Sequence, residues 1–86
     1  MDAKERREKI RQAIFETLSE IDVPLSFSRL KKGVNARIPK VHKYFLEVGL
    51  AAEREWNLEI SEILQELRRE GKVKLVGTDY WVIQGG

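Results

Sequence analysis

The sequence predicts a mainly helical domain that closes with a small β-hairpin, which is an α+β fold class. Three observations lead to this prediction. Apolar residues recur at helical spacing over most of the chain, and their period shortens to two after Gly71. The turn residues Gly77-Thr78-Asp79 separate the two alternating runs. The chain has 86 residues without an internal repeat or linker, so a single domain over residues 1–86 is expected.

The first helix is predicted over residues 3–21, with Asp2 as its N-cap. Its inward stripe comprises Ile10, Ala13, Ile14, Leu18 and Ile21. The helix ends before Pro24, because a proline forces the preceding residue toward an extended backbone. Leu25 is expected to add a short extended piece.

A short second helix is predicted over residues 26–32. Ser26 or Ser28 is its N-cap, because either hydroxyl can accept a hydrogen bond from a free backbone N–H of the first turn. Gly33 is expected to stop this helix, and residues 34–38 are expected to form a loop.

A third helix is predicted over residues 39–54, with Pro39 at its first position, where a missing N–H costs nothing. Its expected inward residues are Val41, Tyr44, Phe45, Val48 and Ala52. Gly49 weakens the middle of this helix by about 1 kcal/mol relative to alanine, so a break there is an alternative.

The fourth helix is predicted over residues 58–70, between an Asn57 cap and Gly71. Its buried stripe comprises Ile60, Ile63, Leu64 and Leu67. A two-stranded hairpin follows over residues 72–83, and residues 84–86 form a tail. The hairpin residues expected to face one side are Val73, Leu75, Trp81 and Ile83.

The order of helices followed by a basic hairpin resembles the winged helix-turn-helix superfamily. The most specific part is the stripe Ile60, Ile63, Leu64 and Leu67, then Arg69-Glu70-Gly71-Lys72-Val73, Gly77 and Tyr80-Trp81-Val82-Ile83. The resemblance implies a double-stranded DNA-binding protein, a small transcriptional regulator, with residues 58–70 as the recognition helix and 72–83 as the wing. It also implies a possible homodimer, for which the first helix near Phe15 is the expected contact.

One segment departs from the simplest members of that superfamily. Residues 36–56 are surplus, because two short helices and one recognition helix normally precede the wing. Either the helix over 39–54 is an insertion, or the 26–32 helix is an extra turn and 39–54 is the first helix of the helix-turn-helix.

The charge is unevenly distributed along the chain. The segment 29–43 contains six Lys and Arg residues and no acid, although the net charge of the whole chain is only +2. Clustered bases bind duplex DNA by releasing condensed counterions, so this segment is a predicted phosphate-binding site; the alternative is a solvated basic face. The predicted contacts are Arg29, Lys31, Lys32, Arg37, Lys40, His42 and Lys43.

The hairpin and the fourth helix supply the other predicted contacts. In the hairpin these are Lys72, Lys74, Thr78 and Tyr80, although lysines also protect an edge strand without any ligand. On the helix they are Ser61, Gln65 and Arg68, which share one strip; glutamine and arginine are common base readers.

An adjacent strip of the same helix carries Glu59, Glu62 and Glu66, which would repel a duplex. Three explanations are open. The helix is rotated so that these carboxylates face away from DNA, the helix does not contact DNA at all, or the glutamates pair with nearby arginines such as Arg69.

Two other functions remain open. A protein-interaction module would dock through the acidic strip or through Trp56, whose other interpretation is a hydrophobic staple before the Asn57 cap. A module for single-stranded nucleic acid or RNA would use the same bases, with Tyr44 or Tyr80 stacking on bases.

Composition argues against several classes of protein. The chain has no cysteine and one histidine, so thiolate chemistry and a zinc site are not expected, and no cofactor is implied. No nucleophile–base arrangement is recognisable, so an enzyme is not expected. The charged amino-terminal segment is not a signal peptide, and no run of residues is apolar enough to span a membrane, which predicts a soluble cytoplasmic protein. The excess of Glu, Lys and Arg leans toward a thermophilic source.

Overall fold

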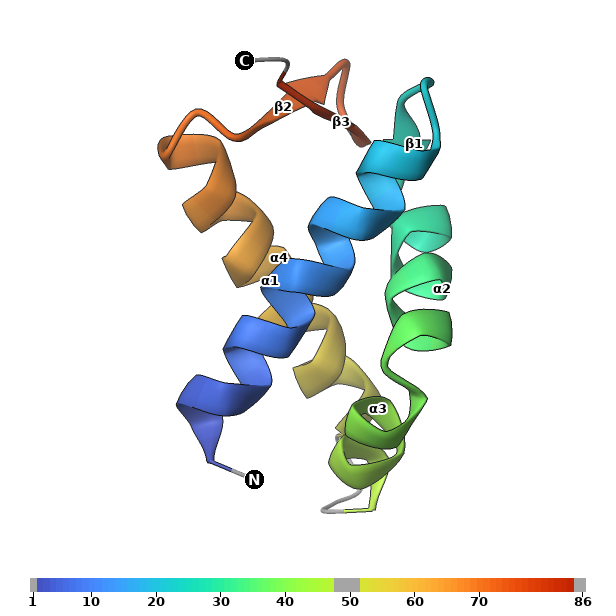
Figure 1. The fold of residues 1–86 in the computed structure, drawn as a ribbon, viewed down its shortest axis with the longest axis vertical. Helices are drawn as coiled ribbons and strands as arrows, with labels where there is room; N and C mark the ends of the chain where they lie inside the picture. The colour runs from blue at the N-terminus through green and yellow to red at the C-terminus, as the bar shows by residue number, and fades with distance from the viewer. Residues whose placement is uncertain (1, 48–51, 85–86) are drawn as a thin grey trace.

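The computed structural model describes residues 2–47 and 52–84. Within these ranges the helices are α1 (Ala3–Glu20), α2 (Phe27–Arg37), α3 (Pro39–Leu46) and α4 (Ala52–Arg69). The strands are β1 (Leu25–Ser26), β2 (Val73–Val76) and β3 (Tyr80–Ile83). Four helices with a small antiparallel sheet confirm the predicted α+β class and are consistent with a winged-helix-like fold (Figure 1).

The sheet has three strands in the order β1-β3-β2, one more than the predicted hairpin. Leu25 pairs with Trp81 across β1 and β3, so the short extended piece expected at Leu25 is confirmed and has a partner. In the hairpin, Val73 pairs with Ile83 and Leu75 with Trp81. These four hairpin residues pack against the core, as the alternation predicts.

The core lies where α1 crosses α4, with α2 beside α1 and the sheet above them (Figure 1). The predicted stripes of α1 and α4 are buried, with Ile10, Ile14, Ile60 and Leu64 fully inaccessible. Ile21 is an exception to the prediction: its side chain is 40% exposed. Its backbone is extended beyond the end of α1, so Ile21 no longer follows the helical stripe.

The starts of α1, α2 and α3 follow the residues predicted for them. The Asp2 carboxylate accepts a hydrogen bond from the Glu5 N–H at 2.8 Å, and the Ser26 hydroxyl accepts one from Arg29 at 3.3 Å. Pro39 occupies the first turn of α3.

The predicted end of the second helix at Gly33 is wrong, because α2 continues through the expected loop to Arg37. Gly33 serves packing instead. A Cβ atom at this position would lie 2.4 Å from Cγ2 of Thr17, a distance at which the two atoms would overlap. The glycine therefore allows α1 and α2 to approach each other closely, and Val34 after it is buried.

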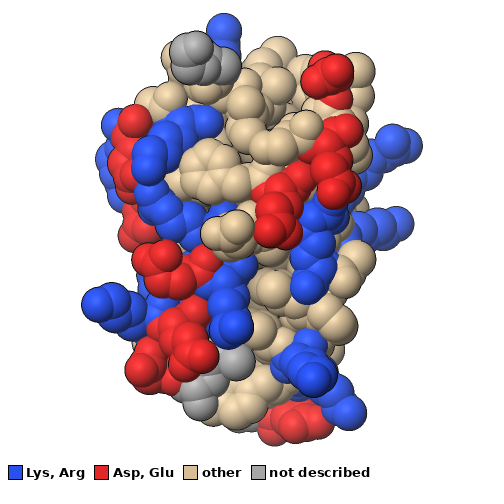
Figure 2. All heavy atoms as spheres, in the orientation of Figure 1, with Lys and Arg blue, Asp and Glu red and all other residues tan. Residues whose placement is uncertain are grey.

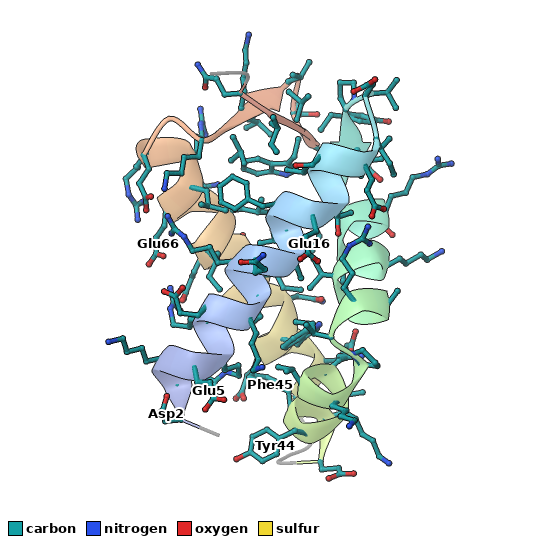
Figure 3. The ribbon with its side chains drawn as sticks, viewed as in Figure 1. Asp2, Glu5, Glu16, Tyr44, Phe45 and Glu66 are labelled. Carbon is teal, nitrogen blue, oxygen red and sulfur yellow. The ribbon has the colours of Figure 1, made fainter. Side chains whose placement is uncertain are left out.

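The helix predicted over 39–54 ends at Leu46, and α4 begins at Ala52, six residues before its predicted start. α3 is therefore a shorter form of the predicted third helix and lies between α2 and α4 in the chain. Val41, Phe45 and Ala52 are buried as expected, but Tyr44 is 43% exposed and projects outward from α3 (Figure 3). The predictions for Val48 and Gly49, and those for Gly85 and Gly86 of the tail, fall outside the described residues.

Trp56 lies inside α4, so neither the predicted staple nor an exposed anchor is correct. Its side chain is fully buried, and its indole N–H donates a hydrogen bond to Asn35 Oδ1 of α2 at 2.8 Å. Asn57 is likewise a residue of the helix and not its cap. The burial of Trp56 fixes the amino-terminal half of α4 against α2.

No helix in residues 2–47 and 52–84 combines the length and apolar character that crossing a bilayer requires.

Candidate nucleic-acid interface

The acidic strip of α4 faces α1. Glu59 accepts hydrogen bonds from both Nε and Nη2 of Arg6, at 2.8 and 3.3 Å. The two side chains are only 12% and 19% exposed, and the Arg6 guanidinium lies 5.2 Å from the centre of the Phe45 ring. This bidentate pair is therefore a partly buried link between α1, α3 and α4.

The rest of the acidic strip is paired in the same way. Arg7 contacts Glu66 at 2.8 Å and Glu62 at 3.6 Å, and Arg11 forms hydrogen bonds to Glu70. The bond from Arg11 lowers the pKa of the Glu70 carboxyl. Acidic and basic side chains alternate over this face in Figure 2.

The explanation that the glutamates pair with arginines is therefore right, but the partners lie on α1. Among the described residues Arg69, the predicted partner, makes no ion pair. In Figure 3, Glu66 lies on the side of α4 that faces α1. The carboxylates are engaged with α1, although Glu62 and Glu66 also line a pocket with Ser61 and Gln65 of the other exposed strip.

That other strip contains the predicted readers Ser61, Gln65 and Arg68. Because α4 begins earlier than predicted, the strip continues two turns back from Ser61, through Leu58 to Arg54. Arg54 and Arg68 are exposed and make no ion pair with any residue that the structure describes. The strip therefore has an arginine at each end, about 21 Å apart at 1.5 Å per residue.

Sequence reasoning missed Arg54, Leu58 and Asn57 as site residues, because it placed the helix start at Leu58, after Arg54 and Asn57. A cleft of about 340 Å³ separates the strip from the hairpin. Its lining residues are Phe27, Arg54, Asn57, Leu58, Ser61, Asp79 and Trp81. The sequence does contain a signal for these positions, because Arg54, Leu58 and Ser61 are spaced as residues on one face of a helix. Extending the predicted helix by one turn toward the amino terminus would have placed Arg54 on the strip.

The basic segment 29–43 is divided by the fold. Lys31 pairs with Glu53 of α4, whose pKa is lowered chiefly by that hydrogen bond. Arg37 contacts Glu16 at 3.8 Å and also bonds Glu20, both on α1. These two bases connect helices and are not available to a ligand without breaking those pairs.

Four of the predicted contacts in this segment keep an outward position. Arg29 and Lys32 are exposed on α2, and Lys40 and Lys43 are exposed on α3. None of the four makes an ion pair within the described ranges. Although Lys31 of α2 pairs with Glu53 of α4, none of the four side chains forms a hydrogen bond or ion pair with the α4 strip within the described ranges.

His42 is not the surface residue that the sequence suggested. Its side chain is 21% exposed, and its Nε2 is buried without a hydrogen-bond partner, 3.6 Å from Glu53. The imidazole centre lies 5.2 Å from that of Trp56. The ring is turned toward α4, so a direct phosphate contact by its Nε2 is not supported.

The hairpin contacts are mostly exposed. Lys74, Thr78 and Tyr80 are solvent-accessible, and Tyr80 is 50% exposed. Lys72 lies 3.4 Å from Glu70, which already bonds Arg11. Three of the four predicted hairpin residues thus remain available to a ligand.

Comparison with known proteins gives one partial similarity. No protein-family model and no solved structure matches this chain. The chain is 30% identical over 77 residues to a subunit of the glutamine-hydrolyzing GMP synthase of Sulfurisphaera tokodaii. The match covers 80% of this chain and 21% of that protein, so the chain spans about a fifth of the relative's length.

Proposed function

We propose that this protein is a winged-helix domain that binds double-stranded DNA, with α4 as the reading helix and the β2–β3 hairpin as the wing. The observation that carries the proposal is the division of α4 into two strips. Glu59, Glu62 and Glu66 of its acidic strip are paired with α1, and its other exposed strip, from Arg54 to Arg68, contains no acid. Regulation of transcription by such a domain is part of the same proposal.

Exposed bases on α2 and on the hairpin fit phosphate contacts. Arg29 and Lys32 are exposed on α2, and Lys74 is exposed on β2. Phosphate contacts position a protein on the duplex, whereas contacts to base edges specify the sequence. We assign the first role to these three bases and the second to Ser61 and Gln65.

A second candidate is the binding of single-stranded nucleic acid. Tyr44 and Tyr80 are 43% and 50% exposed, and exposed aromatic rings stack on unpaired bases. Docking of a protein partner through the acidic strip receives less support, because Arg6, Arg7 and Arg11 already occupy its carboxylates. The expected homodimer contact at Phe15 is also less favoured, because Phe15 packs against the core.

The similarity to part of a GMP synthase does not lead us to propose a synthase activity, because it involves about a fifth of that protein. On α4, Glu59, Glu62 and Glu66 are engaged in ion pairs with α1, and Glu53 pairs with Lys31 of α2. We therefore propose a binding role for this chain.

Fluorescence anisotropy of a labelled random-sequence duplex over a series of salt concentrations tests the proposal. If Arg29, Lys32 and Lys74 each neutralise one phosphate, log K falls with log [salt] with a slope of about −2.7. A single strand of the same length is the comparison. Tighter binding of the single strand would favour the second candidate, and no binding at low salt would contradict both.

A further inference from the structure

Leu58 is an apolar residue in the middle of the polar α4 strip. Its side chain is 55% exposed, although Ile60, Ile63 and Leu64 on the neighbouring turns are buried. It lies one turn from both Arg54 and Ser61. A leucine in this position contributes little to the core, so its side chain is available for a contact with something outside the chain.

The cleft beside Leu58 is also unusual for this face. Phe27, Leu58 and Trp81 give it apolar walls, while Arg54 and Asp79 lie at its rim. The Asp79 carboxylate would repel a phosphate but can accept a hydrogen bond from a base amine. The charge of the cleft therefore suits the edges of bases better than the sugar-phosphate backbone.

Asn57 provides a second, independent observation. It lines the same cleft, and its Oδ1 is buried without a hydrogen-bond partner. A contact between this oxygen and a ligand in the cleft requires the amide to turn toward the cleft about its terminal side-chain bond. A buried acceptor without a partner is costly, so a ligand that supplies an N–H donor would relieve that cost.

An A·T base pair supplies both features in the major groove. The 5-methyl group of thymine is the apolar group that the major groove displays, and the N6 amine of adenine is a donor to amide oxygens. We propose that Leu58 contacts a thymine methyl group and that Asn57 accepts from the paired adenine, so that the cleft selects an A·T pair. This inference rests on the proposed binding of duplex DNA.

The test begins with selection of preferred duplexes from a random library. Each thymine of the selected site is then replaced by deoxyuridine, which removes only the methyl group. At one position the affinity of the unchanged protein should fall about fourfold, the equivalent of one buried carbon at roughly 0.8 kcal/mol. The Leu58→Ala variant should bind the two duplexes equally, and the exposure of Leu58 makes unfolding of this variant unexpected.

Arg54→Ala is the matched control, because it should weaken binding to both duplexes while keeping their fourfold ratio. Replacing the paired adenine by purine, which lacks the N6 amine, should weaken the unchanged protein but not Asn57→Ala. Equal affinity for thymine and deoxyuridine at every position would overturn the inference while leaving duplex binding intact. Failure to enrich or bind any duplex would instead reject the proposed function itself.

Discussion

The two exposed strips of α4 differ in what already contacts them. On one strip, Glu59 and Glu66 are held at 2.8 Å by arginines of α1. On the other, Arg54 and Arg68 have no acidic partner among the described residues. The acidic composition of the helix is therefore a poor guide to what it binds, because most of its negative charge is used within the fold.

The largest expected effect on duplex affinity comes from reversing the charge of the two arginines on the strip from Arg54 to Arg68. In the double variant Arg54→Glu, Arg68→Glu, duplex affinity should fall by about 2–6 kcal/mol, because each arginine contact is worth roughly 1–3 kcal/mol. The free energy of unfolding should change little, since both side chains are exposed and make no ion pair within the described residues. Anisotropy and urea unfolding measure the two quantities.

Lys4→Glu, Lys9→Glu is the matched control for that experiment. It reverses the same amount of charge at two exposed positions of α1. An equal loss of affinity in this control would show that net charge alone governs binding, and the strip would lose its special role.

An intermediate effect, on the free energy of unfolding, is expected from breaking an ion pair between α1 and the acidic strip of α4. Arg6→Ala leaves the Glu59 carboxylate, 12% exposed, without its two hydrogen bonds and should lower the free energy of unfolding by about 1.5–3 kcal/mol. Duplex affinity of the folded variant should stay unchanged. Urea unfolding of the single and double variants with Glu59→Ala gives the coupling energy of the pair.

The more exposed ion pair between Arg7 and Glu62 is the comparison for this loss of stability. These side chains are 32% and 66% exposed and 3.6 Å apart, so Glu62→Ala should cost at most about 1 kcal/mol. A larger loss in Glu62→Ala than in Arg6→Ala would mean that burial does not distinguish these pairs.

The smallest expected effect is a loss of thermal stability at acidic pH. The pKa of Glu53 is lowered by Lys31 and that of Glu70 by Arg11, in each case below an ordinary value of 4.5. A carboxyl with a lowered folded-state pKa stabilises the fold above its unfolded-state pKa and loses this contribution as pH falls through the folded-state pKa. Melting temperatures of the unchanged protein should therefore decline below about pH 4.5. In Glu70→Gln this decline should be shallower, and an identical decline would exclude a contribution from Glu70.

Local patterns in the sequence were sufficient for part of this structure. The stripe from Ile60 to Leu67 and the alternation from Val73 to Ile83 are each set by a single burial period, so both were predicted. The strip of Ser61, Gln65 and Arg68 followed from the same periodicity. Their use in DNA binding remains a prediction.

Other features depend on contacts between distant segments, which a local pattern does not contain. Gly33 has the residue type of a helix stop, but its role is set by Thr17 sixteen residues earlier. Asn57 has the residue type of a cap, but α4 begins before it, at Ala52. The hydrogen bond from Trp56 to Asn35 connects this early part of α4 to α2. Arg37 and Lys31 looked like ligand contacts because their partners Glu20 and Glu53 lie far along the chain.

The strand order has a consequence for how the chain folds. β3 lies between β1 and β2, and Leu25 pairs with Trp81 across more than half of the sequence. During synthesis, β1 has no partner until residues 80–83 have been made, whereas α1 and α2 can already pack against each other. Closing such a long loop is slow compared with forming helices. The sheet should therefore be the last part of the domain to assemble, and the hairpin would join a helical framework that is already in place.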